Sequence, residues 1–358
     1  MKTYKLKTEP IATTQNVWMG IDVHKVSLHI TILDEEGEQV WAGSVPHGRE
    51  HVAGLVRRLE TTQITAVYEA GPTGYKLKHW LEELGCEAFI CPPTHVRQRQ
   101  GGKRIKTDAR DSYDLAEQAR AGMLPAIHDL GEENYHQREV LRTRGQLVKH
   151  RQQLKAQIKS ELLYHSVCAP EGLKANWSKA YLNWLEQGPS ESGDLNLTIH
   201  CLLRTIETLD LQIKRLDARL RKLAKSPKWK KKAELLQSIP GVGLLTAMAV
   251  LLEAGDISRF DRCEEFASWL GLVPSEWSSG EGTRKGSITR AGNRRIRTAL
   301  VESCWTLIRH DEAMNRTYER IKHRRNGSIA VVAVARRLAL IIRAILRDEK
   351  PYDYAPVK

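Results

Sequence analysis

The stretch 17-VWMGIDVHKVSLHITIL-33 places one carboxylate, Asp22, in the middle of an otherwise apolar, β-rich run. Val17, Met19 and Ile21 alternate with other residues before the aspartate. A second alternating set follows it: Val26, Leu28, Ile30 and Ile32. This period of two predicts a strand. An ionised aspartate in a buried strand is costly unless a cation compensates it, so the stretch predicts half of a metal site. The structural alternative is a strand-end aspartate that caps a turn.

The composition predicts a multidomain protein that binds a polyanion. With 358 residues, the chain is long enough for two or three domains. It carries 56 Lys and Arg against 43 Asp and Glu, a net charge of +13, which favours nucleic acid as the partner, with a membrane surface as the other polyanion. We expect no membrane span, because no apolar run reaches roughly 18 residues. Residues 1–15 lack the apolar core of a signal peptide, so we expect a cytoplasmic protein.

The six cysteines are scattered along the chain. They form no C-x-x-C pair and show no Cys/His ligand spacing: Cys86, Cys91, Cys168, Cys201, Cys263 and Cys304. We therefore expect neither zinc nor disulfides, and most of these residues should be small buried apolar groups.

The first third of the chain reads as a mixed sheet with helices. A turn at residues 34–37 predicts a hairpin into a strand at 38–45. Helical and strand patterns then alternate: a helix at 49–59, a strand at 64–68 that runs into Glu69, a helix at 74–84 and a strand at 87–91. The order β-β-α-β-α-β is consistent with the RNase H-like nuclease fold. An actin-like sugar kinase fold also places an aspartate on the first strand of such a hairpin.

A second acidic motif opens the next helix. The segment 106-KTDARDS-112 follows a basic, glycine-interrupted stretch, residues 95–106, and precedes a helical run that ends at Gly122. Thr107 can cap that helix. Asp108 and Asp111 are three apart, which puts both carboxylates on one helical face. Acidic residues are also favoured in a first helical turn by the helix dipole, and that is the structural alternative.

Taken together, Asp22, Glu69, Asp108 and Asp111 are four acids delivered by an α/β pattern. If they cluster, their negative charges repel one another unless Mg²⁺ or Mn²⁺ neutralises them. Two such ions can stabilise both the attacking and the leaving oxygen of a phosphodiester displacement. The sequence therefore predicts a site that is inactive without divalent metal.

The middle of the chain is helical and charged. One long helix is predicted at residues 134–163 and another at 195–223, separated by a Gly/Pro/Ser linker at 188–193. The second helix carries a stripe spaced by three and four: Leu202, Ile206, Leu209, Ile213, Leu216, Leu220 and Leu223. This stripe predicts a coiled-coil seam, formed with the earlier helix or with a partner subunit's helix.

A basic linker, residues 225–232, leads into a helical segment at 235–252 interrupted by 239-IPGVG-243. A Gly-x-Gly turn that opens a helix presents backbone N–H groups to a phosphate. Gly241 and Gly243 thus resemble part of a helix-hairpin-helix element that grips DNA backbones. A mere tight turn explains the same five residues.

A Gly- and Ser-rich stretch, residues 275–297, follows a helical segment at 262–270. We predict a mobile loop that approaches a phosphate backbone. Its cations include Arg284, Lys285, Arg290, Arg294 and Arg295, and together with Lys103, Arg104 and Lys106 we expect them to bind nucleic acid.

The Ser278-Ser279-Gly280 segment beside these cations raises the possibility of a nucleophilic serine. Helices are predicted at 296–310 and 328–347, and residues 323–325 are predicted to be a solvated turn.

In order, these motifs resemble the DEDD-type serine transposases of bacterial insertion sequences, bridge-RNA-guided recombinases related to the pilin-gene invertase. The motifs are 20-GIDVHK-25, 68-YEAGPTG-74, 106-KTDARD-111, 239-IPGVG-243, 271-GLVP-274, SSG at 278–280 and 286-GSITRAGN-293. The resemblance covers residues 16–346. Glu281 stands where the family pattern often has a second glycine.

The resemblance implies three parts: a RuvC-like catalytic domain at 16–130, a helical coiled-coil domain at 131–232 and a mainly α-helical C-terminal transposase domain at 233–348. It also implies that the four acids bind Mg²⁺ and that a serine, carried over to Ser278 with Ser279 as the fallback, attacks DNA to form a phosphoserine link. The implied partners are double-stranded DNA, a structured noncoding guide RNA, and further copies of the chain in a dimer or tetramer.

The rival hypotheses are a RuvC-like metal nuclease that resolves DNA junctions by hydrolysis, an actin-like phosphotransferase, and a non-catalytic nucleic-acid scaffold. The phosphotransferase would need Gly-rich phosphate loops after its strands, and the +13 charge gives it no rationale.

Overall fold

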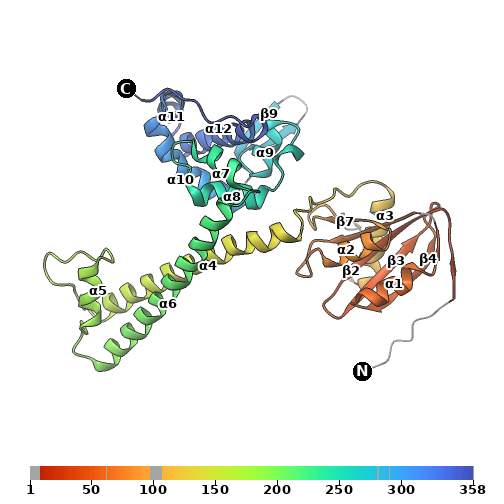
Figure 1. Cartoon of the computed structure of the whole chain (residues 1–358), viewed down its shortest axis with the longest axis horizontal. Coiled ribbons are helices and arrows are strands. Elements are labelled where there is room, and N and C mark those ends of the chain that lie inside the picture. Colours follow the sequence, from red (N-terminus) through yellow and green to blue (C-terminus); the bar gives the residue numbers. More distant parts are fainter. Residues whose placement is uncertain (1–8, 62, 97–106, 280–281, 290, 358) are drawn as a thin grey trace. The chain divides into compact units, whose positions relative to one another are not determined.

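The computed structural model describes residues 9–61, 63–96, 107–279, 282–289 and 291–357. The chain divides into two compact units, Met1–Asp129 and Leu130–Lys358 (Figure 1). The three-part division at 130 and 232 stays a prediction.

The first unit is a mixed α/β domain built on a five-stranded sheet of order β4-β3-β2-β6-β7. Neighbours β4, β3 and β2 are antiparallel, and β2, β6 and β7 are parallel. The prediction of a mixed sheet with helices is confirmed. The strands and helices of this unit are β1 (Ile11–Ala12), β2 (Asn16–Val23), β3 (Ser27–Leu33), β4 (Gln39–Pro46), α1 (Arg49–Val56), β5 (Leu59–Glu60), β6 (Gln63–Glu69), α2 (Lys76–Glu83), β7 (Glu87–Cys91) and α3 (Asp108–Arg120).

The opening stretch forms two strands, so the prediction of one continuous strand over 17–33 is wrong. The chain reverses after Val23, and β2 pairs antiparallel with β3, with Val23 opposite Leu28. Val26 lies in the turn and is 76% exposed. The alternation carried a signal of this turn, because the apolar positions switch from odd to even numbers between Ile21 and Leu28.

Helices cover both faces of the sheet. One apolar core joins Met19, Ile21 and Tyr68 of the sheet to residues of α1 and α2. A second core joins Val67 and Cys91 to Leu115 and Ala119 of α3. Side chains alternate along a strand, so residues two apart face the same side of the sheet. Glu69, two residues after Val67 on β6, therefore lies on the face that α3 covers.

The second unit is mainly helical. Its elements are α4 (Glu132–Tyr164), α5 (Lys179–Glu186), α6 (Gly193–Ala224), α7 (Lys230–Gln237), α8 (Leu244–Ala254), a 3₁₀ turn η1 (Ile257–Arg259), α9 (Cys263–Trp269), β8 (Pro274–Ser279), β9 (Gly282–Ile288), α10 (Arg294–His310), α11 (Glu312–Arg324) and α12 (Gly327–Asp348). Its largest core packs α7 to α12 together and includes the C-terminal end of α6.

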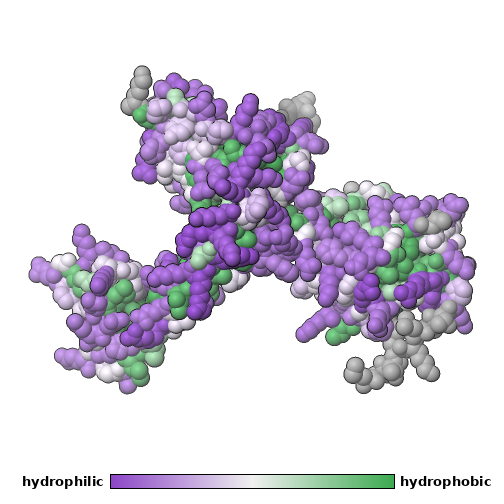
Figure 2. All heavy atoms as spheres, in the orientation of Figure 1, coloured by the Kyte–Doolittle hydropathy of each residue, from purple (hydrophilic) through white to green (hydrophobic). Residues whose placement is uncertain are grey.

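The long helices α4 and α6 lie side by side within this unit (Figure 1). Ion pairs join them, including Arg144 Nε to Asp217 Oδ1 at 2.9 Å. The face of these helices that Figure 2 shows is largely hydrophilic. At one end, Ile158, Ile199 and Tyr181 of α5 share a small core. The sequence allowed α6 to pair either with the earlier helix of the same chain or with a helix of a partner subunit. The structure shows α4 and α6 of one chain packed together. Pairing with a partner subunit stays a prediction.

Several local predictions are corrected in this unit. The stretch predicted to be a mobile loop, 275–297, contains the antiparallel hairpin β8–β9 and the start of α10. The last residues of the predicted basic linker, 230–232, begin α7, and the predicted turn at 323–325 is helical through Arg324.

Fewer cysteines are buried than we expected. All six are free, and Cys86, Cys91 and Cys304 are buried, whereas Cys168 and Cys201 are exposed. The exposed pair lies at the loop after α4 and on α6, where the helices face solvent. None of the helices in the described ranges combines the length and the apolar composition of a membrane-spanning segment.

Candidate active site

Two of the predicted acids stand at neighbouring strand ends in the first unit. Asp22 is the next-to-last residue of β2, and Glu69 is the last residue of β6. These strands run parallel with Ile21 opposite Tyr68, so their carboxyl ends meet at one edge of the sheet. The Asp22 side chain is 23% exposed. The sequence placed this aspartate in a buried strand; β2 is buried through its centre, and Asp22 itself is partly exposed near the carboxyl end of the strand.

Helix α3 delivers the other acids to the same face. Thr107 caps it, and its side chain accepts a hydrogen bond from the backbone N–H of Arg110, as the sequence predicted. Asp108 and Asp111 occupy the first turn, with Asp108 exposed and Asp111 partly buried. The 3.6-residue period places Asp114, one turn further on, along the same side of the helix.

Gly20 allows α3 to approach the sheet closely. A Cβ atom built on Gly20 would lie 2.0 Å from the backbone oxygen of Ser112 and 2.4 Å from the backbone nitrogen of Ala116. Any larger residue would push the helix away from β2. Gly20 and Asp22 are two apart on one strand, so the same face that receives the helix carries the carboxylate.

Ser112 fixes the helix to the sheet by hydrogen bonds. Its buried Oγ lies 2.8 Å from Oγ1 of Thr31 and 3.0 Å from Nδ1 of His29, both on β3. It also lies 3.2 Å from the carbonyl oxygen of Ala109, to which it can donate. Ser112 directly follows Asp111, so this network holds the acidic turn of α3 at a defined height over the strands. Sequence reasoning missed both Gly20 and Ser112.

A cavity of about 260 Å³ collects acids from three elements. Its lining includes Asp22 from β2, Glu69 from β6, and Asp111 and Asp114 from α3. The structure therefore brings three of the four predicted acids into one pocket. Asp114 is a fourth acid that sequence reasoning did not select, although its spacing of three from Asp111 was a usable signal.

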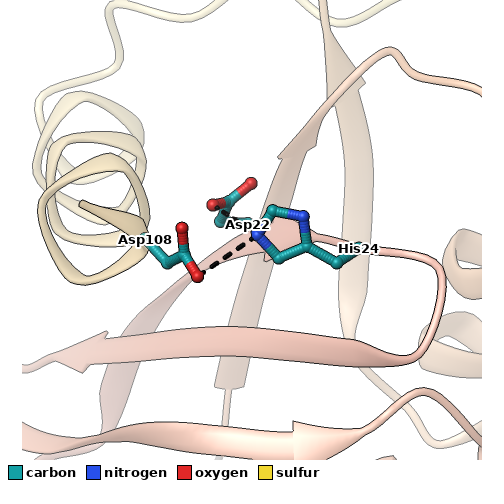
Figure 3. Close-up of side chains that lie close together, drawn as sticks. All are labelled: Asp22, His24 and Asp108. Atoms are coloured by element: carbon teal, nitrogen blue, oxygen red, sulfur yellow. Dashed lines mark ion pairs between the residues drawn. The ribbon is translucent and has the colours of Figure 1, made fainter. Parts of the chain in front are cut away.

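The remaining predicted acid, Asp108, reaches Asp22 through a histidine. His24 Nε2 lies 3.3 Å from Oδ2 of Asp22 and 3.3 Å from Oδ2 of Asp108 (Figure 3). One ligand atom from each of these three residues lies within 4.8 Å of the others. His47 Nδ1 lies 2.7 Å from the carbonyl oxygen of His24 and braces this turn. His24 stood in the quoted motif but was not selected from the sequence.

The loop after Glu69 is anchored by Tyr68. The Tyr68 hydroxyl donates to the carbonyl oxygen of Gly74 at 3.0 Å and accepts from the backbone N–H of Lys78 at 3.2 Å. Burial raises the pKa of this phenol, so it stays protonated and can donate. On the neighbouring strand, burial and then the charge of Glu69 raise the pKa of the Cys91 thiol to about 12. The negative charge of Glu69 is thus close enough to Cys91, its partner on β7, to disfavour the thiolate.

This donor set fits a hard divalent cation. Carboxylate oxygens are the ligands preferred by Mg²⁺ and Mn²⁺, and four carboxylates line this cavity of about 260 Å³. The histidine beside Asp22 and Asp108 adds a nitrogen donor, which Mg²⁺ uses less readily than transition metals.

The predicted serine and its neighbouring cations lie in the second unit. Ser278 and Ser279 are the last residues of β8, and Ser278 pairs with Thr283 of β9. Arg284 and Lys285 are on β9, and for these two residues only the backbone is described. The other predicted binding residues Lys103, Arg104, Lys106 and Arg290 lie outside the described residues.

The turn at residues 239–243, which the sequence predicted to bind a DNA backbone, can instead be explained by packing against α10. Gly241 adopts φ +87°, and a Cβ there would lie 2.3 Å from the backbone oxygen of Ser303 on α10. Gly243 caps the N-terminus of α8, with open space around it. Arg294 and Arg295 are exposed in the first turn of α10. DNA contact by these residues stays a prediction.

Comparison with known proteins decides the family. A model described as "Transposase", of the IS110 DEDD type, matches residues 19–165, which include all four predicted acids. A model described as "Transposase IS116/IS110/IS902 family" matches residues 233–319. The "Putative transposase y4qE" of Sinorhizobium fredii is 32% identical over 307 residues, 83% of this chain and 73% of that protein. The chain belongs to the IS116/IS110/IS902 family of transposases.

Other members of the transposase family match over nearly the whole chain. The transposase for insertion sequence element IS1111A of Coxiella burnetii is 26% identical over 343 residues, 93% of this chain and 90% of the relative. The transposase for insertion sequence element IS1533 of Leptospira borgpetersenii is 25% identical over 348 residues, 94% of this chain and 97% of the relative. The chain is therefore a DNA-modifying enzyme that recombines DNA by transposition.

One part of the resemblance drawn from the sequence is wrong. The matching N-terminal domain is that of a DEDD, RuvC-like transposase family. It is not that of a serine recombinase related to the pilin-gene invertase. The SSG motif led to that assignment because a short serine-glycine segment beside cations fits either a nucleophile or a loop that binds phosphate.

Proposed function

We propose that this transposase cleaves DNA phosphodiester bonds at the acidic cavity of its first unit, with Mg²⁺ or Mn²⁺ held by Asp22, Glu69, Asp111 and Asp108. The observation that carries the proposal is the single cavity that receives acids from β2, β6 and α3. Hydrolysis by water in a RuvC-like manner is the favoured chemistry, because the acids and the space for water and metal are found together in one unit.

The chain's own residues have separable roles in this proposal. The carboxylates of Asp22, Glu69 and Asp111 line the cavity and would hold the cation there. A bound divalent cation stabilises charge that develops on the phosphoryl oxygens during displacement. His24, whose Nε2 lies 3.3 Å from Oδ2 of Asp22 and 3.3 Å from Oδ2 of Asp108, links these two carboxylates.

The proposal is tested by strand cleavage of a plasmid that carries the DNA flanking the coding sequence. We expect nicking with Mg²⁺ or Mn²⁺, none with excess chelator, and none in Asp22→Asn or Asp111→Asn. The matched control is Glu50→Gln, an exposed acid in the first turn of α1, whose core lies on the opposite face of the sheet. Cleavage that persists in chelator or in both aspartate variants would contradict the proposal.

The serine nucleophile stays a second candidate for the attacking group. The placement of Ser278 and Ser279 at the end of β8, next to the turn of a hairpin, is the observation in its favour. A protein-DNA adduct that survives denaturation in the wild type and disappears in Ser278→Ala, but not in Ser279→Ala, would replace water by Ser278. Cleavage without an adduct, retained in Ser278→Ala, supports hydrolysis.

The guide RNA and the oligomer are further predictions. The RNA is tested by purifying the chain with transcripts of its flanking DNA and sequencing what remains bound after nuclease treatment. A dimer or tetramer is tested by light scattering. Recovery of unrelated transcripts alone, or a monomer at all concentrations, would remove these two parts while leaving the metal site untouched.

A further inference from the structure

The strongest concentration of positive charge lies outside every residue so far assigned to nucleic acid. Residues 214–232 contain ten Lys and Arg and one Asp, an excess of nine charges within a chain whose total is +13. They form the C-terminal part of α6, a short connection and the start of α7. The one acid, Asp217, is paired with Arg144 of α4.

These charges border a cleft of about 670 Å³. Four cations line it: Arg219, Lys222, Lys225 and Lys228. Glu133 of α4 is the carboxylate in the lining, and it pairs with Lys228 at 2.9 Å. That hydrogen bond and charge lower the pKa of Glu133, so it stays ionised and neutralises Lys228 at neutral pH. Among the described residues, no ion pair engages Arg219, Lys222 or Lys225.

The cleft is rigidly built. Trp229 is buried, and its indole N–H donates to Oε1 of Gln137 on α4 at 2.7 Å. The Ser226 hydroxyl donates to the carbonyl oxygen of Leu223 at 2.6 Å, and the backbone N–H of Trp229 donates to the carbonyl oxygen of Ser226 at 3.0 Å. The connection between α6 and α7 is thus pinned, and its lysines emerge from a fixed frame. Preorganised cations lose less entropy on binding.

The spacing suits the backbone of a nucleic-acid strand. Arg219, Lys222 and Lys225 follow one another at intervals of three, and a helix rises about 1.5 Å per residue, so they span about 9 Å. Phosphates follow one another at about 3.4 Å along the axis of each strand of duplex DNA. The row thus matches two to three phosphates.

Helix dipoles explain only part of this charge. Cations are favoured at the C-terminal end of α6, where Arg221 and Lys222 lie in the last turn. The three lysines of residues 230–232 lie instead in the first turn of α7, where the helix dipole disfavours positive charge. Lys231 pairs with Glu349, and among the described residues no ion pair engages Lys230 or Lys232. An external polyanion would relieve the repulsion that remains.

We propose that this cleft binds the phosphate backbone of duplex DNA without reading its sequence. The inference rests on the proposed function for its choice of DNA over RNA, because the substrate of cleavage is DNA. It adds a binding surface in the second unit that is separate from the acidic cavity.

The test compares two triple variants of the full chain that remove the same charge. Arg219→Gln/Lys222→Gln/Lys225→Gln removes the cleft cations. Lys149→Gln/Lys159→Gln/Lys174→Gln removes three exposed lysines that do not line the cleft. Affinity for a 30-base-pair duplex of unrelated sequence is measured between 50 and 300 mM salt by fluorescence anisotropy.

Each phosphate contact contributes about 0.9 to the slope of log affinity against log salt, so we expect the cleft variant to lower that slope by about 3. Its affinity at 100 mM salt should fall on the order of 100-fold, equally for all sequences. A cleft variant that binds DNA like the control variant would overturn the proposal, as would a loss confined to duplex RNA of the same length.

Two further measurements separate this proposal from the cleavage proposal. The control variant Lys149→Gln/Lys159→Gln/Lys174→Gln should keep the wild-type slope and the wild-type nicking rate, whereas Asp111→Asn should bind DNA with the wild-type slope and fail to nick. Unchanged thermal unfolding of the cleft variant shows that lost binding is not lost folding, since all three substituted side chains are exposed. If only the nicking result fails, the cleavage proposal is wrong and the DNA-binding role of the cleft still stands. If only the slope result fails, the DNA-binding role of the cleft is wrong and the cleavage proposal still stands.

Discussion

The acidic cavity of the first unit and the cationic cleft of the second are opposite in charge and also in construction. The cavity gathers acids from residue 22 to residue 114 through strand pairing and a close helix-sheet contact at Gly20. The cleft draws its main cations from one short segment, 219–228, at the end of a helix. A site that performs chemistry requires convergence of distant residues to tenths of an ångström, whereas a surface that binds a uniform backbone requires only a dense local charge.

The largest expected effect separates these roles directly. In Asp111→Asn, the carboxylate that lines the cavity becomes an amide, and we expect nicking to fall by at least roughly 10³-fold, because several kcal/mol of charge stabilisation depend on the bound metal. Single-turnover cleavage at saturating DNA measures it. Glu50→Gln should keep the wild-type rate, and equal losses in both variants would show that charge in general, and not this carboxylate, matters.

A second prediction concerns an acid that the second unit buries and neutralises internally. Glu253 is 3% exposed, and it accepts two hydrogen bonds from Arg142, at 2.9 and 2.7 Å, and one from Asn293 at 3.0 Å. Burial alone would raise the pKa of Glu253, but these bonds and the Arg142 charge outweigh it and lower the pKa. In Arg142→Met, we expect the free energy of unfolding to fall by about 3–5 kcal/mol, because a buried charge loses its partner.

The same pair sets a pH dependence. Because the folded-state pKa of Glu253 is depressed, its stabilisation is fully present above the unfolded pKa, about 4.3, and is lost as the pH falls through the lower folded value. Denaturant unfolding of the wild type between pH 7 and pH 3 should show this loss. In Arg142→Met the loss attributable to Glu253 should disappear, and an unchanged pH profile would contradict the assignment.

The third prediction tests the contact that assembles the cavity. In Gly20→Ala, the added Cβ meets the backbone of α3, so we expect a loss of about 1–3 kcal/mol and a drop in nicking at subsaturating metal. Gly43→Ala on β4 is the matched control, because its Cβ would meet only the outer ring atoms of Trp41, at 3.1 Å. Similar losses in the two variants would show that the close approach at Gly20 has no special role.

The smallest effect is expected for Ser112→Ala. It leaves the hydroxyl of Thr31 and the ring of His29 without this partner inside the domain, at a cost of about 1–2 kcal/mol in unfolding free energy. Metal affinity should weaken less than in Gly20→Ala, because the helix stays against the sheet. Hydrogen exchange of α3 amides measures the local loosening, and protection equal to that of the wild type would contradict the role of Ser112.

The sequence predicted elements better than contacts. Strand β7 and the helical cap at Thr107 follow from local patterns, because alternation and capping are properties of a few adjacent residues. The hairpin between β2 and β3 was missed because the turn at 24–26 is short and its only signal is a change of phase in the alternation.

For the site, the sequence selected three of the acids that line the cavity, missed Asp114, and did not predict how these acids are held. Asp22, Glu69 and Asp111 do line one cavity, an inference available from strand ends and helical spacing. The contributions of Gly20, Ser112 and His24 depend on distances across the sheet between residues far apart in the chain, and no local pattern encodes them. The hairpin β8–β9 was missed because its Gly and Ser content is typical of loops.

The central claim, that acids from β2, β6 and α3 hold one metal site, is tested most directly by replacing Mg²⁺ with Fe²⁺. With ascorbate and peroxide, the bound iron produces hydroxyl radicals that cut the polypeptide nearby, and mass spectrometry locates the cuts. We expect cuts close to residues 22, 69 and 108–114 together, all suppressed by excess Mg²⁺ and absent in Asp22→Asn. Cuts at only one of these segments, or cuts that persist in Asp22→Asn, would contradict a shared site.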